Sequence, residues 1–189
     1  SGTFAKYTSE YAGADTALIA KWDVTVSDGE TYLSPEETVD LDLFTHAYNT
    51  NINAIEGEDY IIAPGVSGDF TLKVENKGDV AAKMTFDFEV SGTAGTVPIE
   101  YSLDGSTWVD LATLETELNE LGNMTNVAAE NGTAEQTVHW NWPFDGSDVY
   151  GTNDEEDTAL GKASAAGVSR TDYILTIKAT ATQIAPETT

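Results

Sequence analysis

Few residues in this chain could carry catalytic chemistry. Its two histidines, His46 and His139, lie far apart in the sequence, and neither belongs to the His-Glu-x-x-His pattern by which a helix presents zinc ligands. The chain has no cysteine, which excludes a thiol nucleophile, a zinc–thiolate site and a disulfide framework. It has neither a Gly-x-Ser-x-Gly elbow nor a glycine-rich phosphate loop. We therefore expect a protein that is not an enzyme and has no catalytic residues.

Carboxylates are abundant, with 33 Asp and Glu against 8 Lys and Arg and a formal net charge of −25. With so many, no pair can be assigned general acid and base roles from sequence alone. One acidic stretch contains Asp145, Asp148, Asp154, Glu155, Glu156 and Asp157. Carboxylate oxygens suit Ca²⁺, but the spacing is not that of an EF-hand loop. We expect a solvated acidic loop, with a structural Ca²⁺ as the alternative and no other cofactor or metal.

The net charge and the lack of a long apolar run limit which partners and which location we expect for this chain. A strongly acidic surface makes nucleic acid and anionic lipid headgroups unfavourable partners. No run approaches the ~20 apolar residues that a membrane-spanning helix needs. The start at Ser1 fits removal of a secretion signal, although a tag remnant would look the same. Asn123 and Asn131 each begin an Asn-x-Thr glycosylation sequon, which matters only if the source organism glycosylates.

Strict alternation of apolar and polar residues dominates the chain and predicts strands. The alternating segments are 17–26, 70–75, 82–90, 99–103, 136–144 and 173–182, and short strands are also expected at 60–63 and 107–109, next to turn signals. We expect 70–75 and 82–90 to form an antiparallel pair, and Trp140, Trp142 and Phe144 to lie in the core. About eight strands separated by Gly, Pro, Asn and Asp turns predict an all-β, jelly-roll-type two-sheet sandwich, with residues 16–189 as one domain.

One or two short helices are expected in the loops. Leu111, Leu114, Leu118 and Leu121 recur at helical spacing, so they form the apolar stripe of a helix that covers the sandwich. Asp110 can cap its start and Gly122 can end it in a left-handed conformation. A second helical turn is expected around residues 158–161.

The N-terminal residues 1–11 predict a strand with no evident partner next to it in the chain. At period two, Tyr7 and Tyr11 fall on one face and Phe4 on the other, so both faces carry aromatic rings. Residues 12–15, Ala-Gly-Ala-Asp, form a small-residue joint that could let the strand leave the body. The alternatives are a strand that swings away, with residues 1–15 as a separate arm, and a short strand that hairpins onto its own domain.

Short motifs over nearly the whole chain carry a resemblance to a known family. They are Gly2-Thr3-Phe4-Ala5-Lys6-Tyr7, Ala17-Leu18-Ile19-Ala20-Lys21-Trp22, Ile62-Ala63-Pro64-Gly65-Val66-Ser67-Gly68, Val138-His139-Trp140-Asn141-Trp142-Pro143-Phe144 and Asp157-Thr158-Ala159-Leu160-Gly161. This pattern resembles the TasA/camelysin family of secreted proteins that build biofilm-matrix fibres. The resemblance implies a signal peptide cut before Ser1 and a jelly-roll subunit whose N-terminal strand inserts into the next subunit.

Carried onto this chain, the resemblance makes the donor strand Gly2, Thr3, Phe4, Ala5, Lys6, Tyr7, Thr8, Ser9, Glu10 and Tyr11. The implied partners are copies of the same chain in a head-to-tail polymer, with other matrix fibres or an assembly-initiating protein as further partners. An incomplete sandwich exposes a sheet edge and a strip of core, and a neighbour's strand satisfies both. The acceptor strands do not follow from the resemblance.

Two functions of other classes stay open at this point. A secreted carbohydrate-binding or adhesive module would use the same sandwich and expose Trp108, Trp140 or Trp142 as a stacking platform. A camelysin-like metallopeptidase would need His46, His139 and a carboxylate to converge on one metal ion. The absence of a zinc motif argues against carrying the peptidase activity over.

Overall fold

Alternating strands build most of the computed structural model, which describes residues 6–48, 51–53, 59–94, 96–167 and 170–188. Its strands are β1 (Val24–Ser27), β2 (Ser67–Asn76), β3 (Ala82–Ser91), β4 (Glu100–Ser102), β5 (Asn126–Val127), β6 (Gly132–Asn141) and β7 (Ile174–Gln183). Its helices are α1 (Leu111–Glu120), α2 (Gly122–Thr125) and α3 (Asp154–Ala166). The expected all-β architecture with few short helices is confirmed at this level.

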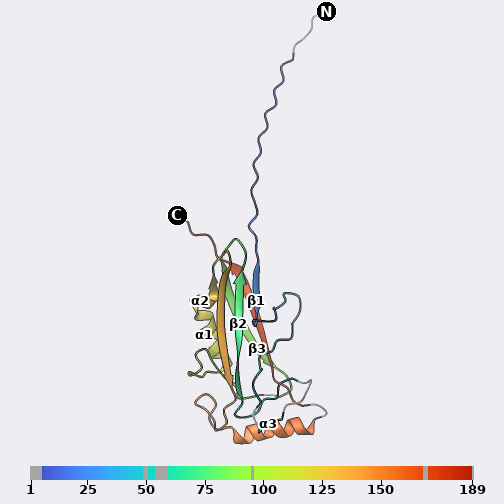
Figure 1. Cartoon of the computed structure of the whole chain (residues 1–189), viewed down its shortest axis with the longest axis vertical. Helices are drawn as coiled ribbons and strands as arrows, with labels where there is room; N and C mark the ends of the chain where they lie inside the picture. The colour runs from blue at the N-terminus through green and yellow to red at the C-terminus, as the bar shows by residue number, and fades with distance from the viewer. Residues whose placement is uncertain (1–5, 49–50, 54–58, 95, 168–169, 189) are drawn as a thin grey trace, which may run out of the picture.

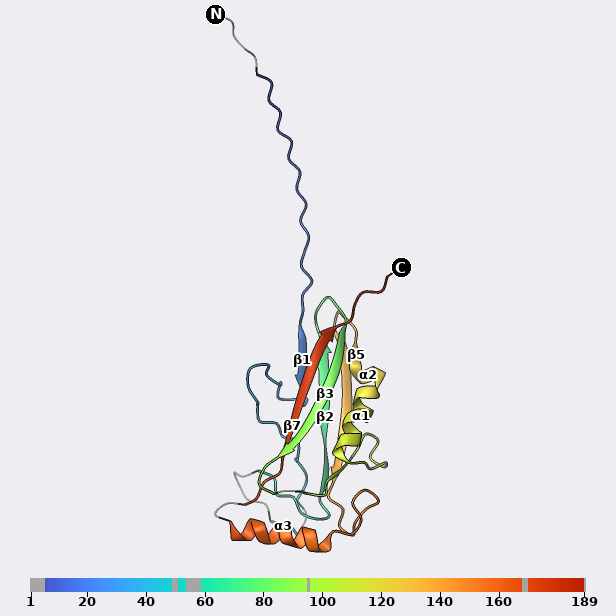
Figure 2. The ribbon, with the colours of Figure 1, turned by 180° about the vertical axis from the view of Figure 1, so that it is seen from behind.

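The strands form two antiparallel sheets that face each other (Figures 1 and 2). One sheet has the order β1-β2-β6-β4 and the other β5-β3-β7. The longest pairings are β2 with β6, from Ser67 opposite Asn141 to Asn76 opposite Gly132, and β3 with β7, from Ala82 opposite Gln183 to Ser91 opposite Ile174. Alternation fixes these registers, because a slip by one residue would turn each apolar face outward.

The expected antiparallel pair of residues 70–75 and 82–90 is wrong. Both segments are strands, but β2 and β3 lie in different sheets. The reason lies at Asn76, which is fully buried at the end of β2. Its side-chain amide donates to the carbonyls of Val80 (2.9 Å) and Val127 (3.3 Å) and accepts from the N–H of Gly78 (3.0 Å). These bonds hold the turn as a connection between the sheets instead of a hairpin within one sheet.

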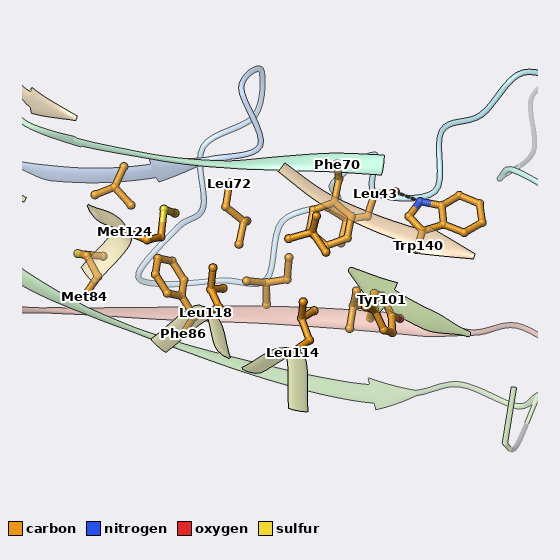
Figure 3. Close-up of a cluster of buried hydrophobic side chains, with 14 of the residues drawn as sticks. Leu43, Phe70, Leu72, Met84, Phe86, Tyr101, Leu114, Leu118, Met124 and Trp140 are labelled. Carbon is orange, nitrogen blue, oxygen red and sulfur yellow. Dashed lines mark hydrogen bonds between the residues drawn. The ribbon is translucent and has the colours of Figure 1, made fainter. Parts of the chain in front are cut away.

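The core lies between the two sheets and is shown in Figure 3. Phe70 and Leu72 of β2 and Met84 and Phe86 of β3 meet there, as the alternation predicts. Trp140 of β6 is fully buried, and its indole N–H donates to the carbonyl of Leu43 at 3.1 Å. Trp142 is buried as expected, but Phe144 is 69% exposed, because it follows Pro143 beyond the end of β6.

Helix α1 confirms the leucine stripe. Leu114 and Leu118 are fully buried, and the carboxylate of Asp110 accepts from the N–H of Thr113 at 2.8 Å. That bond to the ionised form lowers the pKa of Asp110. Gly122 does not form the expected left-handed stop, because it begins α2. The expected turn at residues 158–161 is part of the longer helix α3, whose first turn carries four carboxylates favourable at a helix N-terminus.

Three expected strands differ in the structure, and one of them, residues 107–109, is reduced to an isolated bridge between Val109 and Tyr101. Only Val24–Ser27 of the segment 17–26 pairs with a neighbour, and residues 17–22 are exposed. Residues 60–63 form no strand. Neither residues 17–22 nor residues 60–63 pair with a strand in the part of the chain that the structure describes. No helix within the described ranges is long and apolar enough to cross a membrane.

The N-cap of α1 gives a prediction for stability. Asp110→Ala removes the acceptor for the Thr113 N–H, and we expect the free energy of unfolding to fall by about 1 kcal/mol. Urea unfolding followed by circular dichroism measures it. The control is Asp148→Ala, the same change at an exposed loop carboxylate, where we expect no measurable loss. Equal losses in both variants would contradict the capping role.

Candidate assembly interface

An exposed N-terminal arm is the most unusual feature of the molecule. We define the arm as residues 6–22, all of which are exposed and none of which is in a helix or strand. Figures 1 and 2 show it extending away from the sandwich beyond the start of β1. Tyr7 is 96% exposed, Tyr11, Leu18 and Ile19 are each 92% exposed, and Trp22 is 46% exposed. A run of large apolar side chains in water is unfavourable, so this arm has the character of a binding segment.

The structure places the described part of the expected donor strand, Lys6 to Tyr11, within this arm. Lys6 to Tyr11 pair with none of the described strands, so the structure does not show the alternative of a hairpin onto the same domain for these residues. Gly2, Thr3, Phe4 and Ala5 lie outside the described residues. The arm extends beyond the expected boundary at residue 15, because residues 17–22 join it.

The base of the arm is fixed to the turn between the sheets. The N–H of Lys21 donates to the carboxylate of Asp79 at 2.6 Å, and the N–H of Asp79 donates to the carbonyl of Lys21 at 2.9 Å. The N–H of Lys77 donates to the carbonyl of Asp23 at 2.9 Å. Gly78 permits this close approach, since a Cβ there would lie 2.7 Å from the carbonyl oxygen of Lys21. The direction in which the arm leaves the body is therefore set.

The length of the arm and its balanced charge both suit contact with another copy of the chain. At ~3.3 Å per residue an extended segment of this length spans about 55 Å, compared with about 33 Å for a ten-residue strand such as β7. Its charged residues are Lys6, Glu10, Asp15 and Lys21, which balance. In a chain with a net charge of −25, this segment can approach another copy without adding repulsion.

Three strand edges are closed by the chain itself. On β1, the carbonyl of Val26 accepts from the N–H of Leu33 at 2.8 Å, and Ser27 pairs with Tyr32. On β4, Tyr101 exchanges two hydrogen bonds of 2.8 Å with Val109. These contacts satisfy backbone groups that would otherwise be open to another chain.

Side chains of α1 close the edge of β3 that faces away from β7. Asn119 accepts from the N–H of Phe86 and donates to its carbonyl, each at 2.8 Å, so its amide takes the place of a neighbouring strand. One turn earlier, the carboxylate of Glu115 accepts from the N–H of Phe88 at 2.8 Å. Sequence reasoning missed both roles. The signal was available, because Glu115 and Asn119 are polar residues four apart and share one helix face.

The opposite edge of this sheet is open. Strand β7 pairs with β3 alone among the described strands, and no backbone hydrogen bond from another described segment reaches its outer side. Its start is fixed by Asp172, which accepts from the N–H (2.7 Å) and hydroxyl (2.9 Å) of Thr93. These bonds lower the pKa of Asp172. Part of β2, residues 67–72, also extends beyond the strand β1 that pairs with it.

The alternative of a carbohydrate-stacking platform finds two of its three tryptophans buried. Trp140 is fully buried and Trp142 is 6% exposed, while Trp108 is half-buried. A ring that stacks on a sugar must present its face to solvent, so Trp140 and Trp142 are unsuited to that role. The indole N–H of Trp142 instead donates to Asp157 at 3.2 Å and thereby holds α3.

The histidines do not converge either. His46 packs against the inward-facing ring of Trp140, with ring centroids 5.7 Å apart. His139 precedes Trp140 on β6 and therefore points to the other face of the sheet. Within the described residues, no three His, Asp or Glu side chains are grouped as metal ligands.

The remaining expected sites lie at the surface. The acidic stretch splits into a loop up to Asn153 and the first turn of α3, which contains Asp154, Glu155, Glu156 and Asp157. Asn123 lies in α2 and Asn131 in the turn before β6, and both are exposed. The hydroxyl of Thr125, in the first sequon, is occupied by a bond of 2.9 Å to the carbonyl of Leu121.

The contact at Gly78 gives a second prediction. Gly78→Ala forces the arm base away from the turn, and we expect a loss of about 1–3 kcal/mol in the free energy of unfolding, as for other overpacked sites. Gly161→Ala is the matched control, because a Cβ at that position in α3 meets nothing within 4 Å. We expect that variant to be unchanged or more stable by up to ~1 kcal/mol. Thermal unfolding of both proteins checks the contrast.

Comparisons of the chain with protein-family models, with curated proteins and with solved structures found no match. The resemblance to the TasA/camelysin family therefore stays a prediction from the short motifs quoted above.

Proposed function

We propose that this chain is a structural, non-catalytic subunit of an extracellular filament of the biofilm-matrix type. Each subunit inserts its N-terminal strand, Gly2 to Tyr11, into the next subunit, so the polymer grows head-to-tail by donor-strand complementation. The observation that carries the proposal is the exposed arm with Tyr7, Tyr11, Leu18 and Ile19 in solvent. Secretion, jelly-roll connectivity and membership of the TasA-like group belong to the same proposal.

The physical case rests on what an extended segment can gain. The arm exposes both its backbone hydrogen-bonding groups and its apolar side chains, and a sheet edge on another molecule satisfies both together. The donor segment and the edge that it would enter are different parts of one chain, so the contact is head-to-tail. Repetition of such a contact generates an open filament. The partners are copies of the chain, and other fibres or an initiating protein could join at the ends.

The charge of the subunit supports a filament whose lateral association depends on ions. Each copy contributes a formal charge of −25, so neighbouring filaments repel one another at low ionic strength. The Debye length shortens from about 30 Å at 0.01 M salt to about 10 Å at 0.1 M salt. Cations therefore favour bundling, while the charge-balanced arm makes the contact along the filament less sensitive to salt.

Deletion of residues 1–11 tests the proposal directly. We expect the full chain to form filaments visible by negative-stain electron microscopy, and the truncated chain to stay unpolymerised. The urea unfolding transition should be unchanged, because the described part of the deleted segment contacts no core residue. Unchanged filaments from the truncated chain would refute the assignment of the donor.

A point-variant pair separates the strand from general surface stickiness. Tyr7→Ser with Tyr11→Ser removes two aromatic rings that assembly would bury, so the critical concentration should rise at least about tenfold. The matched control is Tyr32→Ser with Phe144→Ser, which removes two rings that are 57% and 69% exposed on the body. Sedimentation of polymer at graded protein concentrations measures both. A similar rise in the control would argue against a specific role of the arm.

A further inference from the structure

The geometry points to the open edge of β7 as the surface that receives the arm of a neighbouring copy, in antiparallel orientation, with Glu10 opposite Lys178. This inference rests on the proposed function and supplies what it lacks, the acceptor strand and its register.

The choice of edge follows from how the other edges are closed. Val109 bonds the outer side of β4, Leu33 bonds β1, and Asn119 with Glu115 bonds β3. Strand β5 has only two residues. The free part of β2 is six residues long, and its inward side chains are already covered, with Phe70 at 4% and Leu72 at 0% exposure. Strand β7 offers ten residues along one side.

The direction of the chain also fits β7. The arm runs toward β1, and β7 runs the opposite way, ending beside the place where the arm enters the body (Figure 2). Ala20 and Trp22 lie across a shallow hollow from Ala181 and Gln183, which confirms that the start of β1 is near the end of β7. When copies stack in one orientation along the long axis, an incoming arm is therefore antiparallel to β7. Antiparallel pairing allows straight hydrogen bonds along the whole strand.

The inward face of β7 has room for large side chains near its end. Leu175 and Ile177 are 8% and 7% exposed, whereas the small residues Ala179 and Ala181 are only half covered. The hollow at this end is lined by Ala20, Trp22, Val80, Ala181, Thr182 and Gln183. A tyrosine ring placed there would cover Trp22 and complete the core at the open side.

Charge then sets the register. Lys178 is the only charged residue of β7. Its side chain is 68% exposed on the outward face, and its ammonium lies 3.9 Å from the carboxylate of Glu89 on β3, an exposed pair that leaves room for a second carboxylate. Glu10 is the only acidic residue of the expected donor strand. With these two opposite each other, Thr8 lies opposite Thr180 on the outward face and Tyr7 lies opposite Ala181 on the inward face. The same register therefore pairs the carboxylate of Glu10 with the ammonium of Lys178 and brings the ring of Tyr7 to the hollow.

Cysteine cross-linking tests this register cleanly, because the chain has no cysteine of its own. Thr8→Cys protein is mixed with Thr180→Cys protein, allowed to polymerise under reducing conditions and then oxidised. Directly opposed residues in an antiparallel pair have Cα atoms about 4.5–5.5 Å apart, within the range of a disulfide. In an equal mixture, half of the Thr8→Cys arms enter a Thr180→Cys subunit, so we expect up to about half of the polymerised chains to run as covalent dimers on a denaturing gel.

Two further mixtures act as controls for the position. Thr8→Cys with Thr182→Cys moves the partner two residues along β7, and Thr8→Cys with Thr71→Cys tests the free edge of β2. Both should cross-link several-fold less than the Thr180 mixture. Filaments that cross-link through Thr71 would overturn the inference and leave the proposed function intact, while cross-links through Thr182 would overturn the register. Failure of the unmodified chain to polymerise would overturn both.

A charge exchange gives a second readout that does not depend on cysteine variants assembling. Glu10→Lys or Lys178→Glu alone places like charges together and should raise the critical concentration several-fold. The double variant restores the pair and should return it toward that of the unmodified chain. Equal additive losses without rescue would contradict the pairing of Glu10 with Lys178.

Discussion

Backbone groups at a sheet edge must find hydrogen-bond partners, and this requirement organises the molecule. Every strand of a two-sheet sandwich that lacks a neighbour leaves a row of N–H and C=O groups open. Here a loop residue closes β4, another closes β1, and two side chains of α1 close β3. One ten-residue edge is left, on β7. The chain also carries an extended arm that pairs with none of the described strands. The open edge of β7 and the extended arm are complementary, because each has backbone N–H and C=O groups that the other could bond.

The turn between β2 and β3 links this arrangement to the core. Asn76 is fully buried, and its three hydrogen bonds replace those that a hairpin would make. Because the chain crosses there to the second sheet, β7 and not β2 becomes the neighbour of β3. The same turn holds Lys21 and Asp23 against Lys77 and Asp79, so it also sets the point at which the arm leaves the body. One polar residue in the core thus determines both the topology and the origin of the arm.

Charge divides the molecule into two parts. The body carries the whole formal net charge of −25, because the charges of the arm cancel. Self-association through the body surface is therefore opposed by repulsion, whereas association through the arm depends on backbone bonds and apolar contacts. Such a division favours ordered end-to-end assembly over amorphous aggregation, even though the arm exposes several large apolar side chains.

The sequence determined the strands of the core, the capped helix α1 and the exclusion of thiol chemistry, because each depends on local periodicity or composition. Phe70, Met84, Val138 and Ile177 fall on the faces that alternation assigns to them. Only the tertiary structure decided which strands pair, since Asn76 acts through contacts 4 and 51 residues away. It also decided that residues 17–22 stay outside the sheet. Asn119 hydrogen-bonds the edge of β3 at Phe86, 33 residues earlier in the chain, and this contact too depends on the tertiary structure. Periodicity states which face of a strand is buried, but the identity of its neighbour depends on long-range contacts that no local pattern contains.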